Sequence, residues 1–378
     1  MTGLKATIAG LVMLAVPLVA TAQDAGELVY GKRTDWSSSS RVINFSMFAF
    51  NDVNRNGIHD LADRPMSAVA VAVARDGIGA GAAFTNANGF ANFKAEAGDD
   101  EEPISQPGSY RFELIVPPGW KASTGNAGQT VEIVERPGSI SGLAVVRMPA
   151  PVGLVQDLFV SGVAGAEAPV MLMSGTQTIA TGVAGADGAF RLPVEEPGRY
   201  VVRVGEVERA VEIVSTPVAL GTVAPRQAVA GGAPMVLSFD DLTTNGIFKI
   251  PSGYGDLNWF NLNALRRDFT PKSEGYVNGA TSQPYVAYTS SGAYAEVYSD
   301  RPFDLHGMQL TIAWREAEGE TAVIEVWRGE TQVLRDEIEV SVLGPVSYQP
   351  RIGGVTRVRI GTAHDWQLVV DDLVVGRP

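Results

Sequence analysis

A twelve-residue stretch near the start of the chain has the residue types and spacing of a calcium-binding loop. Between Asp52 and Asp63, oxygen-bearing side chains occupy positions 1, 3, 5, 9 and 12, and Gly57 stands at position 6. Ca²⁺ takes about six to eight hard oxygen ligands, and alternate residues of a tightly wound loop point inward. The predicted ligands are Asp52, Asn54, Asn56, the carbonyl of Ile58, Asp60 and Asp63.

The residues around this loop indicate what kind of site it is. The flanking runs have strand-like alternation, which argues against a helix-loop-helix. Asp63 stands where the EF-hand register has Glu, and its shorter side chain predicts a weaker, structural site instead of a sensor. The alternative is a turn rich in Asn and Asp that caps itself and needs no metal.

Two acidic pairs stand at matching places near the two ends of the last third of the chain. The runs 235–242 and 366–375 each read as a strand with paired carboxylates. First and last strands that lie side by side, as in jelly rolls, would bring these carboxylates together. The group is a candidate second Ca²⁺ site, with solvation of strand ends as the alternative. Its residues are Asp240, Asp241, Asp371 and Asp372.

Aromatic residues gather in the same region and suggest a binding surface. Aromatic rings stack on sugar rings or anchor protein partners, and loops on a rigid β scaffold often carry binding residues. The alternative is that these rings fill the core of the domain. The candidate ligand-binding residues are Tyr254, Trp259 and Tyr276.

The elements that must position these residues are β-strands. From residue 41 onward, short alternating apolar runs are bounded by Asn, Asp, Gly and Pro, with almost no helical periodicity. The 42 glycines and 22 prolines fit tight turns between the strands of sandwiches. We therefore expect an all-β protein, with tandem small β-sandwiches of prealbumin or Ig type followed by a C-terminal jelly-roll sandwich.

An internal repeat and two Pro-rich stretches divide the chain. Residues 88–114 and 187–204 both read as a turn, a strand, a Pro-Gly turn and a strand that opens with Tyr. Composition places boundaries near residues 150 and 225. The predicted parts are a signal peptide (1–22), an N-terminal segment (23–40), a Ca²⁺-binding sandwich (41–150), a second small sandwich (151–225), a linker (226–234) and a jelly-roll domain (235–378).

The first sandwich resembles the SD-repeat B-type (Cna-B-like) domain of bacterial surface proteins. The resemblance covers about residues 41–148 and is carried by the strand before the loop, the Asp-x-Asn-x-Asn-Gly-x-x-Asp loop itself, and the segments 65–73, 85–93 and 107–110. In that family the loop binds Ca²⁺ and stiffens adhesin stalks. The first strand lacks the Lys with which some relatives form an isopeptide bond. The region 235–378 resembles the galactose-binding-like jelly-roll domains of exported proteins.

The first residues predict export. Lys5, the following apolar run and the small residues 20–22 are typical of a cleaved signal peptide. We therefore expect a secreted or cell-surface protein, with the periplasm as an alternative, and no membrane insertion, because no later run is long enough to span a bilayer. The chain has no cysteine, so apolar cores and bound metal must hold the fold without disulfides.

Charge and motif content narrow the function. A net charge of −13 disfavours nucleic acid as a partner. The sequence has no Gly-x-Ser-x-Gly elbow, His-Glu-x-x-His motif or phosphate loop, so we expect a non-enzyme, with a hydrolase less favoured. The predicted function is adhesion or binding of extracellular matrix or glycans. The region 235–378 would be the recognition head for a carbohydrate or a cell-surface protein, and the alternative is a purely structural spacer or matrix protein.

Overall fold

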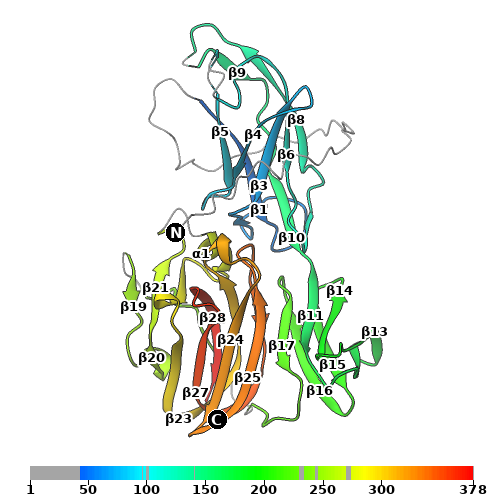
Figure 1. The fold of residues 1–378 in the computed structure, drawn as a ribbon, viewed down its shortest axis with the longest axis vertical. Coiled ribbons are helices and arrows are strands. Elements are labelled where there is room, and N and C mark those ends of the chain that lie inside the picture. The colour runs from blue at the N-terminus through cyan, green and yellow to red at the C-terminus, as the bar shows by residue number, and fades with distance from the viewer. Residues whose placement is uncertain are drawn as a thin grey trace, which may run out of the picture.

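The computed structural model describes residues 43–95, 97–98, 102–139, 141–229, 234–242, 246–269 and 274–377. The predicted signal peptide (1–22) and N-terminal segment (23–40) lie outside the described residues. The described chain folds mostly as β-strands, with very little helix, in three packed units, which confirms the all-β prediction (Figure 1). Within this part of the chain, no helix is long and apolar enough to cross a membrane.

The first unit is a sandwich of two sheets around one apolar core. One sheet has the order β2-β1-β10-β7, with β5 paired to the first half of β1, and the facing sheet has the order β4-β3-β6-β8-β9. Inward-facing residues alternate along the strands, as Val71 and Val73 do in β3. The strands are β1 (Ile43–Asn51), β2 (Arg64–Pro65), β3 (Ala70–Arg75), β4 (Ile78–Phe84), β5 (Phe90–Ala95), β6 (Gly108–Leu114), β7 (Trp120–Ala122), β8 (Gly128–Glu135), β9 (Leu143–Val145) and β10 (Val152–Gln156).

The boundary between the first two units lies later than the sequence indicates. Strand β10 pairs in parallel with β1 and antiparallel with β7, and Val152 and Leu154 are buried in the first core. A boundary at residue 150 would therefore cut the first sandwich. Pro149 and Pro151 stand directly before β10, which is the last strand of the first sandwich. The second unit begins with β11 at Leu158.

The second unit is a smaller sandwich in which β14-β11-β17 faces β13-β12-β15-β16. It repeats the first unit in detail. Tyr110 is the third residue of β6 and Tyr200 the third residue of β15, and each hydroxyl donates to the carbonyl four residues earlier, at 2.9 and 2.7 Å. The strands are β11 (Leu158–Val163), β12 (Pro169–Ser174), β13 (Gln177–Val183), β14 (Ala189–Val194), β15 (Gly198–Val204), β16 (Val207–Ile213) and β17 (Val218–Thr222).

The third unit is the jelly-roll sandwich. Its first and last strands pair as predicted, with Met235 opposite Val375. The long strand β23 joins both sheets, since its first half pairs with β20 and β27 and its second half with β28 and β26. The elements are β18 (Met235–Leu237), β19 (Phe248–Lys249), η2 (Tyr254–Asp256), β20 (Asn258–Phe260), β21 (Leu262–Arg266), α1 (Glu274–Gly279), β22 (Tyr285–Thr289), η3 (Ser290–Gly292), β23 (Ala295–Ile312), η4 (Arg315–Ala317), β24 (Glu320–Arg328), β25 (Thr331–Val340), β26 (Val346–Tyr348), β27 (Ile352–Thr362) and β28 (Leu368–Gly376).

The second sandwich and the jelly roll share a sheet. Strand β17 pairs in parallel with β26, so that Ala219 lies opposite Tyr348. The described part of the predicted linker also lies on the jelly roll, because Arg226 donates to the carbonyl of Pro350 at 3.0 Å and the amide of Gly353 donates to the carbonyl of Gln227 at 3.1 Å. These two units are therefore one packed body.

The first sandwich docks on the jelly roll through a buried amide. Asn278 in α1 accepts from the backbone N–H of Ser67 at 2.9 Å and donates to the carbonyls of Ser67 at 3.0 Å and Val342 at 2.9 Å. Both Ser67 and Asn278 are buried. Beside them, the guanidinium of Arg315 lies 3.7 Å from the ring centre of Phe84.

We predict that Asn278→Ala destabilises the intact chain. Truncation leaves the buried N–H and C=O of Ser67 without their side-chain partner, which costs about 1–3 kcal/mol for each unsatisfied group. Thermal unfolding followed by circular dichroism measures the loss. Asn258→Ala, at a partly exposed position in the same unit, serves as the control. Equal melting temperatures for Asn278→Ala and wild type would show that this contact does not contribute to stability.

Candidate functional site

The predicted calcium loop begins where β1 ends, at the buried Asp52. One carboxylate oxygen accepts from the backbone N–H of Asn56 at 3.0 Å, and the other accepts from that of Gly57 at 2.8 Å. Gly57 has a φ of 73°, which glycine adopts without steric cost. The carboxylate of Asp52 therefore holds the loop in a tight turn around its own charge.

The middle of the loop brings three of the predicted ligands together. The side-chain amides of Asn54 and Asn56 both donate to the same carboxylate oxygen of Asp60, each at 2.9 Å. The amide oxygen of Asn56 accepts from the N–H of Ile58 at 2.7 Å. The alternate positions of the loop thus converge on one point at the protein surface, as the spacing predicts.

Asp63 closes the loop. Its two carboxylate oxygens accept from the backbone N–H groups of Val53 at 3.1 Å and Asp60 at 2.9 Å. Burial raises the pKa of Asp63, and repulsion from Asp52 and Asp60 adds to the shift. The pKa of Asp60 is lowered, chiefly by the hydrogen bond from the N–H of Ala62. Three carboxylates therefore repel one another within one short loop.

The oxygen atoms of the loop suit a hard cation only if side-chain amides and a backbone carbonyl are among the ligands. Among the described residues, no group of three or more His, Cys, Asp or Glu side chains has the arrangement of a metal site. The loop instead mixes three carboxylates with two amides and the backbone of Ile58, and a mixed oxygen set of this kind is what Ca²⁺ accepts. The neighbouring His59 points its ring at Phe48 and Phe50, with centroid distances of 5.0 and 4.8 Å, so it packs on the sandwich beneath the loop.

The second acidic group is partly assembled. Asp371 is buried, and one of its oxygens accepts from the backbone N–H of Thr281 at 2.6 Å and of Ser282 at 3.1 Å. The hydroxyl of Thr281 bridges it to Asp372, at 2.9 and 2.7 Å. Asp240 lies near enough for its pKa to be raised by burial and by the charge of Asp372. Three of the four predicted carboxylates therefore meet.

The fourth carboxylate belongs to a different contact, and a side-chain cation faces the group. Asp241 accepts from the hydroxyl of Tyr254 at 2.8 Å. Arg64, which follows the calcium loop directly, is partly buried and lies near enough to feel the charges of both Asp371 and Asp372. Protein N–H groups and hydroxyls already donate to these two carboxylates, and a second Ca²⁺ site at this place stays a prediction.

Of the three predicted ligand-binding aromatics, Trp259 and Tyr276 are core residues and Tyr254 is partly buried against the core, which corrects the prediction of an exposed aromatic surface. Trp259 is buried, and its indole N–H donates to the carbonyl of Tyr254 at 2.9 Å. Tyr254 is partly buried and packs against the jelly-roll core between Phe239 and Trp259, and its pKa is raised well above its ordinary value, mainly by burial. Tyr276 is buried in α1, where its hydroxyl meets Gln367 at 3.0 Å. Two of the adjacent glycines are sites of close packing, because a Cβ on Gly255 would lie 2.6 Å from Leu237 and a Cβ on Gly275 would lie 1.8 Å from the carbonyl oxygen of Ile312.

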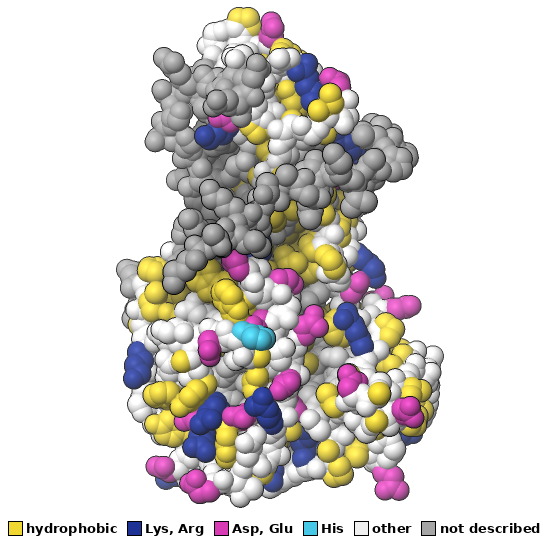
Figure 2. Space-filling model, in the orientation of Figure 1, with side chains coloured by type: hydrophobic (Ala, Val, Ile, Leu, Met, Phe, Trp, Pro, Cys, Tyr) yellow, Lys and Arg dark blue, Asp and Glu magenta, His cyan; other side chains and the backbone are white. Residues whose placement is uncertain are grey.

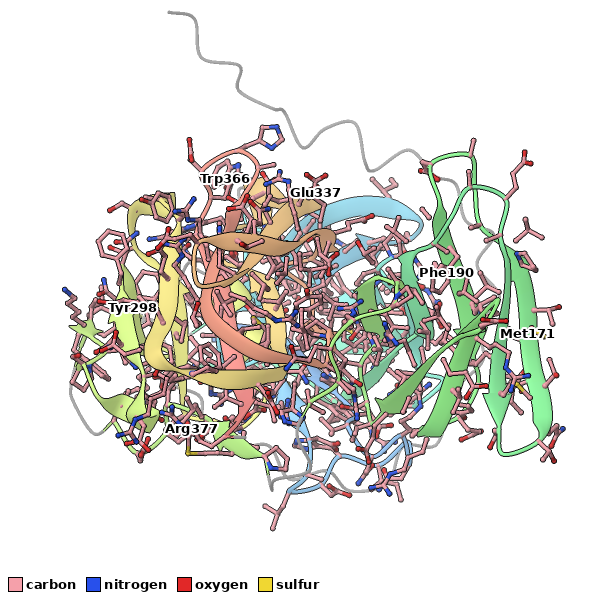
Figure 3. The ribbon with its side chains drawn as sticks, turned by 90° about the horizontal axis from the view of Figure 1, so that it is seen from below. Met171, Phe190, Tyr298, Glu337, Trp366 and Arg377 are labelled. Atoms are coloured by element: carbon pink, nitrogen blue, oxygen red, sulfur yellow. The ribbon has the colours of Figure 1, made fainter. Side chains whose placement is uncertain are left out.

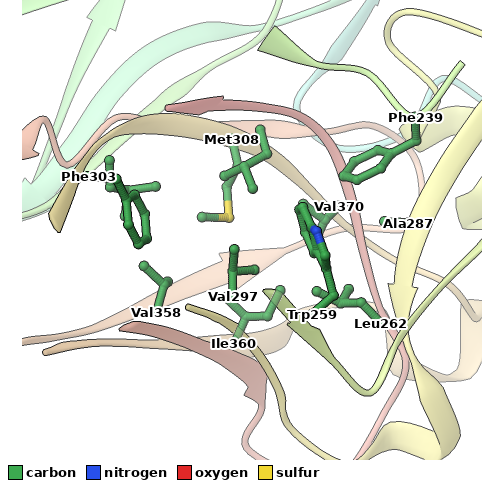
Figure 4. Close-up of a pocket in the computed structure, with 12 residues that line it drawn as sticks. Phe239, Trp259, Leu262, Ala287, Val297, Phe303, Met308, Val358, Ile360 and Val370 are labelled. Carbon is green, nitrogen blue, oxygen red and sulfur yellow. The ribbon is translucent and has the colours of Figure 1, made fainter. Parts of the chain in front are cut away.

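The interior of the jelly roll does not offer a ligand site. A cavity lies between its two sheets, and apolar side chains line it, among them Trp259, Met308 and Val370 (Figure 4). Its volume of about 10 Å³ is close to that of a single water. A ligand larger than a water molecule therefore cannot enter this cavity.

An exposed group of aromatic and arginine side chains lies on the outer face of one jelly-roll sheet, and the sequence reasoning missed it. Figure 2 shows hydrophobic and basic side chains side by side over β23, β27 and β24. Tyr298 lies on the side of the jelly roll away from Phe190 and Met171 of the second sandwich (Figure 3). The exposed fractions are 48% for Phe260, 48% for Tyr294 and 39% for Tyr298. Alternation along the strands was the signal that could have found them.

Comparisons with known proteins leave the family open. No family model matches the chain, and no curated protein matches it. Among solved structures, it is similar to the Streptococcal ancillary pilin at 12% identity over 50% of this chain and 64% of that one, with a TM-score of 0.23. It is similar to the minor pilin GBS52 of Streptococcus agalactiae at 13% identity over 50% of this chain and 99% of that one, with a TM-score of 0.20. It is also similar to the M60 catalytic domain with two CBM51 domains from Clostridium perfringens ZmpB at 10% identity (92% and 32%; TM-score 0.21). Likenesses this weak carry no function to this chain, so its own residues must carry the argument.

We predict that the stability of the chain falls as the pH rises from about 4 to about 7. Burial, followed by repulsion from Asp372, raises the pKa of Asp371 from 3.8 to about 7. In this window the folded state keeps a proton that the unfolded chain has lost, so deprotonation opposes folding. Asp372→Asn removes the repulsion and should flatten this slope in chemical denaturation series. Asp300→Asn, an exposed acid in the same unit, should leave the slope as in wild type. Parallel slopes for wild type and Asp372→Asn would contradict the coupling.

Proposed function

We propose that this chain is an exported, Ca²⁺-binding β protein that acts in adhesion or in binding extracellular matrix or glycans, with the jelly roll as its recognition domain. The observation that carries the proposal is the gathering of exposed aromatic and arginine side chains on one sheet face of the jelly roll. Aromatic rings and arginines are the side chains that dominate recognition surfaces. The cavity between the jelly-roll sheets is too small for a sugar ring, so an exposed face of this kind is the better candidate for recognition.

The loop between β1 and β2 supports the Ca²⁺ part of the proposal. Its residues would hold the ion through Asp52, Asn54, Asn56, the carbonyl of Ile58, Asp60 and Asp63. When bound, Ca²⁺ supplies positive charge that offsets the mutual repulsion of the three carboxylates. The chain itself provides the turn, since the backbone N–H groups of Asn56 and Gly57 fix Asp52 before any ion binds.

The way the three units pack favours a second reading, a structural matrix protein. The shared sheet at β17 and β26 and the buried Asn278 contact make a compact scaffold instead of a string of separate spacers. A scaffold of this kind needs no ligand. The two readings differ in whether the intact chain binds anything through the jelly roll.

We predict that Ca²⁺ raises the melting temperature of the intact chain relative to EDTA, because an ion that binds only the folded loop stabilises it by mass action. Asp60→Asn should reduce this difference, since it removes an exposed ligand and leaves the Asp52 turn intact. Differential scanning calorimetry with and without Ca²⁺ measures the effect. Glu132→Gln, an exposed charge change in the same sandwich, is the control. Superimposable wild-type curves in Ca²⁺ and EDTA would exclude Ca²⁺ binding by this loop.

A binding screen with the intact chain separates recognition from scaffolding. Retention is measured on immobilised neutral polysaccharides, acidic polysaccharides and matrix proteins. A recognition protein should be retained on at least one of these surfaces and released by the same soluble polymer. A chain that binds none of them, although folded and loaded with Ca²⁺, would favour the structural reading.

A further inference from the structure

Strand register assembles one continuous outer face on the jelly roll. Strands β20, β23, β27, β24 and β25 run side by side, so that Phe260, Glu296 and Arg359 stand in one row. Two residues further along, Tyr298 and Trp327 flank Arg357 on either side as its direct cross-strand partners. Residues two apart on a strand face the same way, so both rows point to solvent. We call this surface the arginine–aromatic face; its members are Phe260, Tyr294, Tyr298, Trp327, Arg357 and Arg359.

One arginine of this face is already neutralised. Arg359 pairs with Glu296 at 2.9 Å and with Glu325 at 3.6 Å, and its guanidinium lies 4.3 Å from the ring centre of Tyr294. Its charge and its hydrogen-bonding capacity are satisfied within the protein. Arg359 therefore organises the aromatic rings and offers little to a ligand.

The neighbouring arginine is not neutralised. Arg357 stacks over Trp327, with 4.5 Å between the guanidinium carbon and the ring centre, and the indole beneath is only 8% exposed. Its Nε atom is buried without a hydrogen-bond partner. Among the residues that the structure describes, no carboxylate lies within 4.0 Å of its guanidinium. The buried Nε cannot reach a ligand, but the two terminal nitrogens of this guanidinium, which lies over the indole, have no carboxylate partner among the described residues and can form a bidentate bond to an oxyanion.

The ring beside Arg357 defines the rest of the ligand. Tyr298 stands directly across the strand pair and is 39% exposed. Directly opposed side chains in a sheet lie about 4.5–5.5 Å apart at Cβ, which is a distance that one pyranose ring can bridge. The exposed face of Tyr298 can take the C–H side of a sugar while Arg357 takes an acidic group on the same ring.

We propose that the arginine–aromatic face binds acidic polysaccharides, with the carboxylate of a uronic acid on Arg357 and the sugar ring against Tyr298. This inference rests on the proposed recognition function of the jelly roll and adds the ligand class and the site. The net charge of −13 repels polyanions at long range, but this repulsion is screened beyond about 8 Å at physiological salt. Binding therefore depends on the local, unpaired guanidinium and not on a general basic surface.

The test uses the intact chain and oligosaccharides of alginate, a uronic acid polymer, in isothermal titration at physiological salt. Arg357→Gln should lower the affinity at least tenfold, and Tyr298→Ala should lower it severalfold, as expected for one aromatic contact. Arg357→Lys keeps the positive charge but lacks the planar set of N–H donors, so it should keep only part of the wild-type affinity. Arg335→Gln is the matched control, because it makes the same charge change at an arginine of the same sheet that pairs with Glu325 and Glu337. It should stay within about twofold of wild type.

Each alternative outcome has a distinct meaning. Equal losses in Arg335→Gln and Arg357→Gln would overturn the site, because they would indicate nonspecific electrostatics. Equal affinity for alginate and for carboxyl-reduced alginate would overturn the acidic ligand while recognition of glycans stands. Full competition by poly-glutamate would assign the face to acidic protein instead. Wild-type chain that binds neither acidic nor neutral polysaccharides nor matrix proteins would overturn the proposed recognition function itself. Melting temperatures are measured for all variants, so that a loss of binding is distinguished from a loss of folding. Tyr298→Ala changes an exposed side chain, so it tests binding most directly.

Discussion

The parallel pairing of β17 with β26 is the contact on which the arrangement of the molecule depends. It carries one sheet of the second sandwich into the jelly roll, so neither unit can turn without breaking backbone hydrogen bonds. The buried carboxylate of Asp336 secures the seam: it accepts from the amide and hydroxyl of Thr222 at 2.8 and 2.7 Å and from the hydroxyl of Tyr348 at 2.7 Å. A Cβ on Gly221 would lie 1.8 Å from this carboxylate, so a residue without a side chain is required there.

The first sandwich is fixed to the same body by different chemistry. Its contact uses the amide of Asn278 and the charge of Arg64 facing Asp371 and Asp372, together with the apolar Leu343, which packs against the cores of both units. Burying a charge is costly unless partners are provided, and here hydroxyl and backbone donors surround the carboxylates. The contact between the first sandwich and the jelly roll is therefore specific in orientation. Its stability depends more on pH than that of the β17–β26 pairing, which is made by backbone hydrogen bonds.

The sequence predicted what short-range pattern determines. The turn that begins at Asp52 and the repeated positions of Tyr110 and Tyr200 follow from local spacing. The pairing of the first and last jelly-roll strands was expected from the fold class, and Ca²⁺ binding by the loop stays a prediction. It could not predict what distant residues decide together. Tyr276 stands beside glycines yet is buried, because α1 packs against β23 and β28. The arginine–aromatic face combines Phe260 with Arg359, about a hundred residues later, and only register brings them together.

Consecutive residues connect the calcium loop to the interdomain joint. Asp63 is the last predicted ligand, and Arg64, the next residue, begins β2 and faces the carboxylates of the jelly roll. Because β2 is only two residues long and pairs with the end of β1, the backbone has little freedom to absorb a shift between these positions. The predicted calcium loop and the contact of the first sandwich with the jelly roll are therefore joined through two consecutive residues, Asp63 and Arg64, with β2 held in register by β1.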